Sequence, residues 1–338
     1  VLDQGEVGKQ ASGAASGLLA PIKPFTKKDD LYTLLLLSCL ALFPELVHEL
    51  QEVTGLCIGY KQTGTLRFLH AKKRSRLEQW VIAWQQAGFE MAILSDDDIL
   101  RYESGVATTG VVGLYNPHEP QLDATQFMQA YAHAGNMLGA IFYPGEEVIA
   151  VERQGTRVKC VHTAQGQSFF CNHVILATGA WSAACGEWLG IRIPVRPLRG
   201  QNIAISQPSI PLQHSLFGEG VYLAPKGDEL LVVGTVLDDA GFATEITPEG
   251  TQWLCDAARK VVPALAACPI QYAWAGLLPK TPDARPILGA APTWDNVTLA
   301  CGHNGFGLLL APVGDLIAEY IVSGHMPASL KPFGLERF

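Results

Sequence analysis

Val297-Thr-Leu-Ala-Cys301, Gly302-His-Asn-Gly-Phe-Gly307 and Leu308-Leu-Leu-Ala-Pro-Val-Gly-Asp-Leu-Ile-Ala-Glu-Tyr-Ile321 follow one another near the end of the chain. They predict a short buried strand, a glycine-rich turn and an apolar helix that begins at Leu308. Glycines lack Cβ atoms and therefore let a ligand approach the backbone closely. The first turn of a helix presents unpaired N–H groups and a partial positive charge. We therefore expect this stretch to bind an anion, either a phosphate or the N1–C2=O edge of a flavin.

Val1-Leu-Asp3, at the other end, predicts a short apolar strand that ends in an acid. In dinucleotide-binding units such an acid binds the adenosine ribose hydroxyls. The alternative is that Asp3 is a turn residue, and taken alone that alternative is favoured. The glycine fingerprint that precedes such a strand would lie before Val1. We expect roughly 30 upstream residues with an apolar strand and G-x-G-x-x-G, because their absence would leave unpaired backbone groups inside the sheet.

Composition limits the classes of function. The chain has 338 residues, of which 48% are hydrophobic, so it can bury the core of one large domain or two. Its formal net charge of -8 argues against a nucleic-acid partner, which would require a basic face. The one basic cluster, 72–76, is too short to change this.

The eight cysteines contain no C-x-x-C and no Cys/His pairing at zinc spacing. They predict buried apolar thiols, no metal site and a cytoplasmic location. Leu34 to Phe43 is the most apolar run, but Pro44 follows it. Because a membrane span needs about 20 apolar residues, we expect no span here but a core helix that Asp29 and Asp30 cap.

The rest of the chain alternates two kinds of segment. Its first half predicts a hairpin over 54–69, helices over 73–88, from Asp96 and over 122–139 with Asp123 as cap, a strand over 140–143, a meander over 147–171 and a buried strand over 174–177. Past Pro194 short alternating runs predict a mostly antiparallel sheet, with strands over 201–205, 221–224 and 230–236 and a helix over 248–262.

Four stretches carry a family resemblance because they occur together in this order. They are Ala11-Ser-Gly-Ala-Ala-Ser-Gly-Leu-Leu-Ala-Pro21, His173-Val-Ile-Leu-Ala-Thr-Gly-Ala-Trp-Ser182, Trp274-Ala-Gly-Leu-Leu-Pro-Lys-Thr-Pro-Asp283 with Pro286-Ile-Leu-Gly289, and 302–312. Together they resemble the FAD-dependent D-amino-acid-oxidase-type superfamily, most of all its glycine oxidase (thiamine-biosynthesis oxidase) branch. Pro194 to Gln201 and Tyr222 to Pro225 add to the resemblance, which covers essentially the whole chain.

The resemblance implies a mixed fold, α/β plus α+β. A Rossmann-like FAD-binding domain (1–50, 118–197 and 277–338), apparently without its first strand, would be interleaved with an antiparallel-sheet substrate domain (51–117 and 198–276). FAD is the implied cofactor. The implied FAD-binding residues are Asp3, Ala11, Ser12, Gly13, Ala15, Ser16, Gly17, Leu18, Thr178, Gly179, Trp181, Gly302, His303, Asn304, Gly305, Phe306 and Gly307.

The oxidation of an amine requires positioning and electrostatics from the protein more than acid-base groups. Tyr222 corresponds to the pocket tyrosine of the glycine oxidase branch; it either binds the substrate or simply packs in the sheet. His303 lies inside the predicted flavin turn, where local hydrogen bonding is the alternative to a catalytic role. Trp181 and Trp274 favour packing over chemistry.

Three positions depart from the glycine oxidase pattern. Leu278 and Gly305 stand where that branch has arginines, and Gly220 stands where it has a pocket histidine. Because a bidentate arginine is the strong way to bind a carboxylate, the catalytic positions Leu278 and Gly305 put glycine itself in doubt as the substrate. A bulkier or N-substituted amine fits better, or a carboxylate that Arg199, Lys226 or Lys280 binds instead.

The sequence therefore predicts an FAD-dependent enzyme that oxidises a small amine or amino acid to an imine. The electron acceptor is either oxygen or another electron carrier, and the sequence does not decide between them. It also leaves open whether the protein forms a homo-oligomer. The contrasting class is a non-catalytic flavoprotein subunit, which the absent arginines and the absent nucleotide fingerprint favour.

Overall fold

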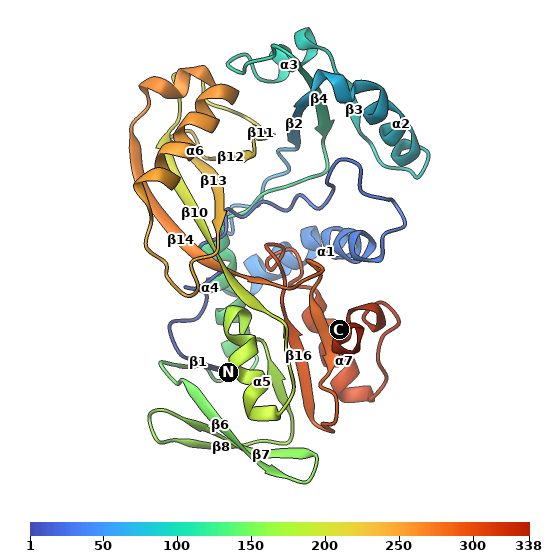
Figure 1. Ribbon diagram of the computed structural model, residues 1–338, viewed down its shortest axis with the longest axis vertical. Helices are drawn as coiled ribbons and strands as arrows, with labels where there is room; N and C mark the ends of the chain where they lie inside the picture. The colour runs from blue at the N-terminus through green and yellow to red at the C-terminus, as the bar shows by residue number, and fades with distance from the viewer.

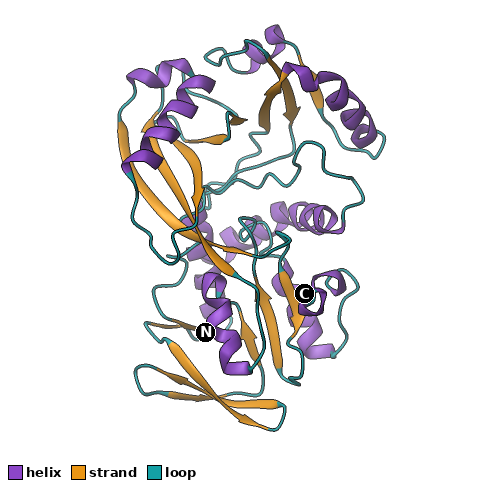
Figure 2. Ribbon diagram, in the orientation of Figure 1, coloured by secondary structure: helices purple, strands orange, loops and turns teal.

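The computed structural model describes Val1–Phe338. Helices and strands occur at both ends of its long axis (Figures 1 and 2). The α-helices are α1 Leu31–Thr54, α2 Arg74–Gln85, α3 Asp96–Tyr102, α4 Ala124–Met137, α5 Ser182–Leu189, α6 Pro248–Val261 and α7 Val313–Ser323. The strands are β1 Leu2–Asp3, β2 Thr65–His70, β3 Ala92–Leu94, β4 Val111–Asn116, β5 Tyr143–Pro144, β6 Val148–Gln154, β7 Arg157–Thr163, β8 Ser168–Phe170, β9 Val174–Leu176, β10 Arg196–Ser206, β11 Ser215–Gly218, β12 Val221–Lys226, β13 Leu230–Asp238, β14 Ile270–Lys280, β15 Ile287–Ala290 and β16 Val297–Cys301.

The largest sheet has eight strands in the order β14-β10-β13-β12-β11-β2-β4-β3. Its neighbours pair antiparallel, except that β11 and β2 are parallel. The predicted hairpin over 54–69 is wrong, because β2 is the only strand there and pairs with β4 and β11. Alternating residues identify a strand, but its partner depends on tertiary packing. The three predicted strands past Pro194 are confirmed as β10, β12 and β13.

A smaller sheet, β15-β16-β9, contains the parallel pair β16 and β9. The strand predicted over 174–177 is thus confirmed, but it is not buried throughout, since Ile175 is 49% exposed. β1 pairs parallel with β5 in a separate two-stranded sheet. The predicted upstream strand and the predicted domain boundaries stay predictions.

Helix α1 is longer than predicted, because it continues through Pro44 to Thr54. Proline removes one hydrogen-bond donor, but Val47 and Leu50 beyond it are buried on the core-facing side and keep the helix packed. Asp30 caps α1 by accepting a hydrogen bond from the Thr33 N–H at 2.9 Å. By length and composition alone α1 could cross a membrane, and 39% of its most apolar window is buried within this fold.

Helix α7 begins at Val313, so the predicted start at Leu308 is wrong. The residues before it form consecutive turns, in which the Leu310 N–H donates to the Phe306 carbonyl and the Val313 N–H to the Leu310 carbonyl, each at 3.0 Å. Pro312 has no N–H and suits the position just before a first helical turn. The glycine-rich turn is therefore separated from the regular helix by several residues.

Most other predicted elements are confirmed. These are α2, α3 with its Ser95 capping box, α4 with its Asp123 cap, the meander β6-β7-β8 and α6. The strand expected over 140–143 is present only as the two-residue strand β5, Tyr143–Pro144. All eight cysteines are free thiols and five are buried, but Cys57 is exposed, contrary to the expectation.

Asn296 joins the meander to the small parallel sheet. Its side chain is buried, accepts from the Val158 N–H at 2.9 Å, and donates to the carbonyls of Val158 at 2.8 Å and Asn172 at 2.9 Å. We expect Asn296→Ala to lower the free energy of unfolding by about 2 to 4 kcal/mol, because it leaves buried backbone groups without partners.

Urea unfolding measures this loss. Asn172→Ala is the matched control, since only its backbone carbonyl takes part and its side chain is exposed. It should change the free energy by less than about 0.5 kcal/mol. Equal losses in the two variants would contradict the role of the Asn296 side chain.

Candidate functional site

One row of side chains crosses the eight-stranded sheet on a single face. Residues that are direct register partners on neighbouring strands point to the same side. Here an unbroken set of such partners runs from β2 to β14. It consists of Arg67, Phe217, Tyr222, Gly234, Asn202 and Trp274. We call it the Tyr222 row.

The hydroxyl of Tyr222 crosses the β13 backbone and donates to Asn202 Oδ1 at 2.8 Å. Gly234 lies between the two side chains. A Cβ atom on Gly234 would be 2.5 Å from Tyr222 Cζ, which is closer than atoms pack. Only glycine at 234 permits this hydrogen bond.

The predicted flavin segment 11–18 lies on the same face. The carbonyl of Ala14 accepts from Trp274 Nε1 at 3.0 Å and from Asn202 Nδ2 at 3.5 Å. The Ala14 methyl group occupies the space where Gly276 on β14 lacks a side chain. The segment is thereby fixed against β10 and β14.

The glycine-rich turn reaches this face through Leu278. Leu278 lies two residues after Gly276 on β14, and so on the same side of the strand. A Cβ atom on Gly305 would be 3.4 Å from Leu278 Cδ2. Two segments that are far apart in the sequence, 11–18 and 302–307, thus adjoin one strand.

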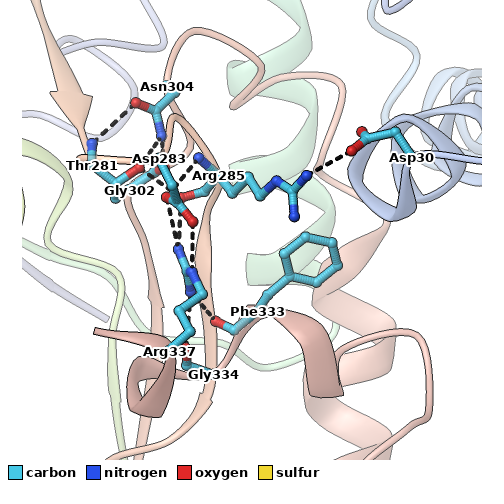
Figure 3. A network of polar contacts seen from close by, with 9 residues as sticks. All are labelled: Asp30, Thr281, Asp283, Arg285, Gly302, Asn304, Phe333, Gly334 and Arg337. Carbon is cyan, nitrogen blue, oxygen red and sulfur yellow. Dashed lines mark hydrogen bonds and ion pairs between the residues drawn. The ribbon is translucent and has the colours of Figure 1, made fainter. Parts of the chain in front are cut away.

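Asn304 fixes the turn with its side chain, a role that the sequence did not predict (Figure 3). Its Oδ1 accepts from the Thr281 N–H at 3.0 Å, and its Nδ2 donates to Thr281 Oγ1 at 2.8 Å and to the Gly302 carbonyl. Its φ is 49°, a left-handed conformation that asparagine tolerates. The side chain of Asn304 therefore supports the backbone rather than facing a ligand.

Several backbone N–H groups of the two segments donate no hydrogen bond within the protein. They belong to Ser16, Gly17 and Leu18, and to Gly305, Gly307, Leu308 and Leu309. Gly17 and Leu309 are buried. Because an unpaired buried N–H costs about 1 to 3 kcal/mol, these groups fit the oxygen and nitrogen edge of a ligand such as a flavin.

Comparison with known proteins agrees with this geometry. The family model described as FAD dependent oxidoreductase, DAO, matches residues 1–320. The chain belongs to this DAO family. The family resemblance, the mixed fold with its glycine oxidase-like architecture, and the assignment as an FAD-dependent oxidoreductase are confirmed.

Individual relatives of the DAO family fit over nearly the whole chain. The crystal structure of glycine oxidase from Geobacillus kaustophilus has a TM-score of 0.93 at 28% identity, and the match covers 100% of this chain and 91% of that one. The bifunctional protein ThiO/ThiG of Trichormus variabilis is 32% identical over 334 residues, which are 97% of this chain and 50% of the relative. The chain thus spans half the length of that relative. Hydrogen cyanide synthase subunit HcnC of Pseudomonas aeruginosa is 29% identical over 301 residues, which are 88% of this chain and 72% of the relative.

The other predicted FAD-binding residues occupy separate places. Asp3 is the last residue of β1 and accepts from the Gly5 N–H at 2.9 Å, as expected if Asp3 is a turn residue. Thr178 donates to Ser182 Oγ at 3.1 Å just after β9. Gly179 has a φ of 50°, and the Trp181 ring stacks on Phe242 with centroids 5.4 Å apart. Asp3 and Thr178 both lie at the carboxyl ends of parallel strands, where nucleotides bind in such sheets.

Of the cations suggested as substitutes for the arginines, Arg199 is engaged by other groups, and Lys280 lies beside a separate cavity. Arg199 forms a bidentate pair with Asp238, with both contacts at 2.8 Å, and donates to the Glu245 carbonyl at 2.7 Å. Lys280 lines a cavity of about 780 Å³ beside α5 that none of the predicted flavin residues lines. Arg199 is therefore not free to bind a ligand at the Tyr222 row.

Lys226 lies next to the first flavin segment. Its ammonium donates to Gln121 Oε1 and the Leu122 carbonyl, each at 3.0 Å, and would be 3.3 Å from a Cβ on Gly17. Burial lowers the pKa of Lys226 to about 8, while Asp123 opposes this shift. Both acceptors are uncharged, so Lys226 fixes Gln121 and Leu122, and the Leu122 N–H in turn donates to the Gly17 carbonyl at 2.9 Å.

Two titratable groups of the site are held neutral. Burial raises the pKa of Tyr222 to about 12, and the neighbouring Ser16 hydroxyl opposes this. Burial lowers the pKa of His303 to about 4. At neutral pH Tyr222 keeps its proton and His303 is an uncharged imidazole.

Gly307 offers a test of the turn. A Cβ atom there would meet only His303 Cβ at 3.9 Å, an ordinary contact, so the protein itself has room for a side chain. We expect Gly307→Val to fold but to lose flavin, because the side chain would cover the unpaired N–H groups. Thermal unfolding of the flavin-free protein and the flavin content per chain measure the two effects.

Gly314→Val is the matched control, because a Cβ atom on Gly314 has no neighbour within 4 Å and the residue lies in α7. It should keep the flavin content of the unmodified protein. Full flavin content in Gly307→Val would remove the assignment of this turn.

His303 predicts a pH effect on stability. Its folded pKa of about 4 is below the unfolded value of about 6.5, so its contribution is complete above pH 6.5 and is lost as the pH falls toward 4. Between pH 7 and pH 4.5, the free energy of unfolding of the flavin-free protein should fall. We expect this fall to be about 1 to 3 kcal/mol smaller in His303→Gln than in the unmodified protein. Urea unfolding at both pH values measures this, and parallel pH curves would contradict it.

Proposed function

We propose that the protein binds FAD and oxidises the amine C–N bond of an amino acid or N-substituted amino acid to an imine, which water then hydrolyses. The observation that carries this proposal is the meeting of two segments with unpaired N–H groups at the face that presents Tyr222 and Asn202. We also propose the two interleaved domains and the cytoplasmic location stated above. Eight free thiols suit a reducing compartment.

Each element of the site has a part in this reaction. FAD, when bound, supplies the acceptor for two electrons. The free N–H groups of Gly305, Gly307, Leu308 and Leu309 would bind the flavin edge that becomes negative on reduction, and those of 16–18 a second edge. The Tyr222 hydroxyl donates a hydrogen bond to Asn202. Its oxygen can therefore accept a hydrogen bond from the substrate nitrogen.

The substrate-side walls are mostly uncharged at neutral pH. Leu278 adjoins Gly305, and His303 nearby is neutral, so no guanidinium lies at the two positions where the glycine oxidase branch has one. A small carboxylate would find no bidentate partner there. This supports a substrate other than glycine.

An anaerobic titration tests the proposed function. Purified protein should be yellow, and its flavin should bleach when a suitable amine is added without oxygen. Reoxidation by oxygen would make it an oxidase. Slow reoxidation by oxygen and fast reoxidation by a quinone or dye would favour the second candidate, a dehydrogenase. Colourless, well-folded protein would contradict the proposal and favour a non-catalytic subunit.

Leu278 tests the substrate assignment. The unmodified protein should turn glycine over poorly, and Leu278→Arg should raise kcat/KM for glycine by about tenfold or more, through a charge-assisted pair of roughly 1.5 to 3 kcal/mol. Leu278→Gln, polar but uncharged, is the control and should not. Efficient glycine turnover by the unmodified protein would show that another group binds the carboxylate.

A further inference from the structure

Positive charge gathers at one end of the Tyr222 row. Arg67 begins the row on β2, and Lys23 lies in the loop before α1, which runs between α1 and the lobe of β2, β4 and α2 (Figure 1). Glu119 is the carboxylate that pairs with Arg67, and it also accepts from the backbone N–H of Ile22, the neighbour of Lys23. None of these three residues belongs to one of the motifs that carry the family resemblance.

Arg67 is buried, with 8% of its surface exposed, yet only one of its nitrogens is bonded. Its Nη2 donates to Glu119 Oε2 at 2.9 Å, and its Nε and Nη1 donate to no acceptor in the protein. The guanidinium lies 3.9 Å from the centroid of the Phe217 ring. The Phe217 ring in turn packs edge-on against Tyr222, with centroids 6.4 Å apart. The free donors of Arg67 therefore belong to the same face as the candidate site.

Lys23 approaches the same region from the other side. The N–H of Ile22 donates to Glu119 Oε1 at 3.0 Å, which fixes the backbone next to Lys23. The Lys23 ammonium lies 4.9 Å from the centroid of Phe306, in the predicted flavin turn, and makes no hydrogen bond. Lys23 is an exposed residue, but partial loss of hydration, and then the charge of Arg67, lower its pKa. Lys23 thus lies near a second cation without an anion of its own.

Glu119 cannot neutralise both cations. Its Oε2 accepts from Thr65 and Arg67, and its Oε1 accepts from Ile22. One negative charge therefore faces two positive ones, and the remaining donors are the planar N–H groups of Arg67 and the ammonium of Lys23. A guanidinium with two free N–H groups beside an ammonium is the arrangement that binds a carboxylate.

We propose that Lys23 and Arg67 bind a carboxylate of the substrate, at a distance from the carbon that is oxidised. Arg67 lies two strands from Tyr222, about 10 Å at the backbone, so the acid and the reacting amine would lie in different parts of one elongated molecule. The substrate class is therefore an amine or N-substituted amino acid that carries a distal carboxylate. This inference rests on the proposed function, and it assigns the carboxylate site that Leu278 and Gly305 do not provide.

Glutarate serves as the probe, because it has the carboxylates without an amine to oxidise. Its binding to the purified protein is measured by calorimetry and by the change it causes in the flavin absorbance. We expect Lys23→Met to raise the Kd of glutarate about tenfold, and Arg67→Lys to raise it by about as much. Arg67→Lys keeps a cation beside Glu119, so the buried carboxylate is not left unpaired.

Two variants control for charge and for stacking. Arg76 lies 4.3 Å over the Phe25 ring, outside the Tyr222 row, and matches the Arg67 and Phe217 pair. Lys28 is, like Lys23, an exposed lysine of this loop, but it does not lie over the Phe306 ring. Arg76→Met and Lys28→Met should keep the Kd of glutarate within about twofold, since neither charge lies beside Phe306 or in the Tyr222 row. An equal loss in these controls would mean non-specific attraction and would overturn the proposal.

Steady-state kinetics supply the second readout. For an amine with a distal carboxylate, Lys23→Met should raise KM about tenfold and leave kcat unchanged, while the KM of the matching primary amide stays constant. The inference alone would be overturned if the protein is yellow and oxidises amines, but binds glutarate and acidic amines equally well with and without Lys23. A colourless protein that binds glutarate through Lys23 would instead overturn the proposed function and leave an anion site.

Discussion

The carbonyl oxygen of Ala14 accepts hydrogen bonds from Trp274 and Asn202, and the rest of the site depends on this contact. It joins a segment near the N-terminus to two strands from the last half of the chain. The contact is possible because Gly276 has no side chain where the Ala14 methyl group lies. Burial of a carbonyl between two donors satisfies the backbone and fixes the position of the following residues. The N–H groups of 16–18 are left unpaired as a result.

A second network fixes the glycine-rich turn from outside (Figure 3). Arg337 pairs with Asp283 and donates to the carbonyls of Phe333, Gly334 and Arg285. Arg285 in turn contacts Asp30, the residue that caps α1, at 2.6 Å. The loop 281–285, to which Asn304 ties the turn, is therefore connected to both α1 and the C-terminal segment. Such a frame holds backbone donors in place before a ligand arrives, which is what electrostatic preorganisation requires.

The sequence predicted the local elements well but not their partners. Asp123, Asp96 and Pro248 each mark a helix start, because capping and proline chemistry act within a few residues. The hairpin at 54–69 failed, because strand pairing depends on contacts between distant segments. The prediction that the helix ends near Pro44 failed for a similar reason. Helix α1 continues past Pro44 because burial of the later turns outweighs one missing hydrogen bond.

The same limit applies to the candidate site. Motifs marked both glycine-rich segments, but Asn202, Gly234, Phe217 and Arg67 belong to no motif. They join the site only through register across neighbouring strands. A glycine inside the alternating run 230–236 was the one available signal, because a strand glycine often marks a close approach of another group. Here that group is the Tyr222 hydroxyl.

The distribution of charge connects this architecture to function. His303 is uncharged and Tyr222 keeps its proton, so neither adds a charge to the face between the two glycine-rich segments. Negative charge that develops on a reduced flavin would therefore be stabilised by backbone N–H groups, which need no counter-ion. A guanidinium at 278 or 305 would act on the flavin and on the substrate at once. In the proposed assignment, Arg67 would recognise an acidic group two strands away from Tyr222, whereas backbone N–H groups would stabilise the flavin.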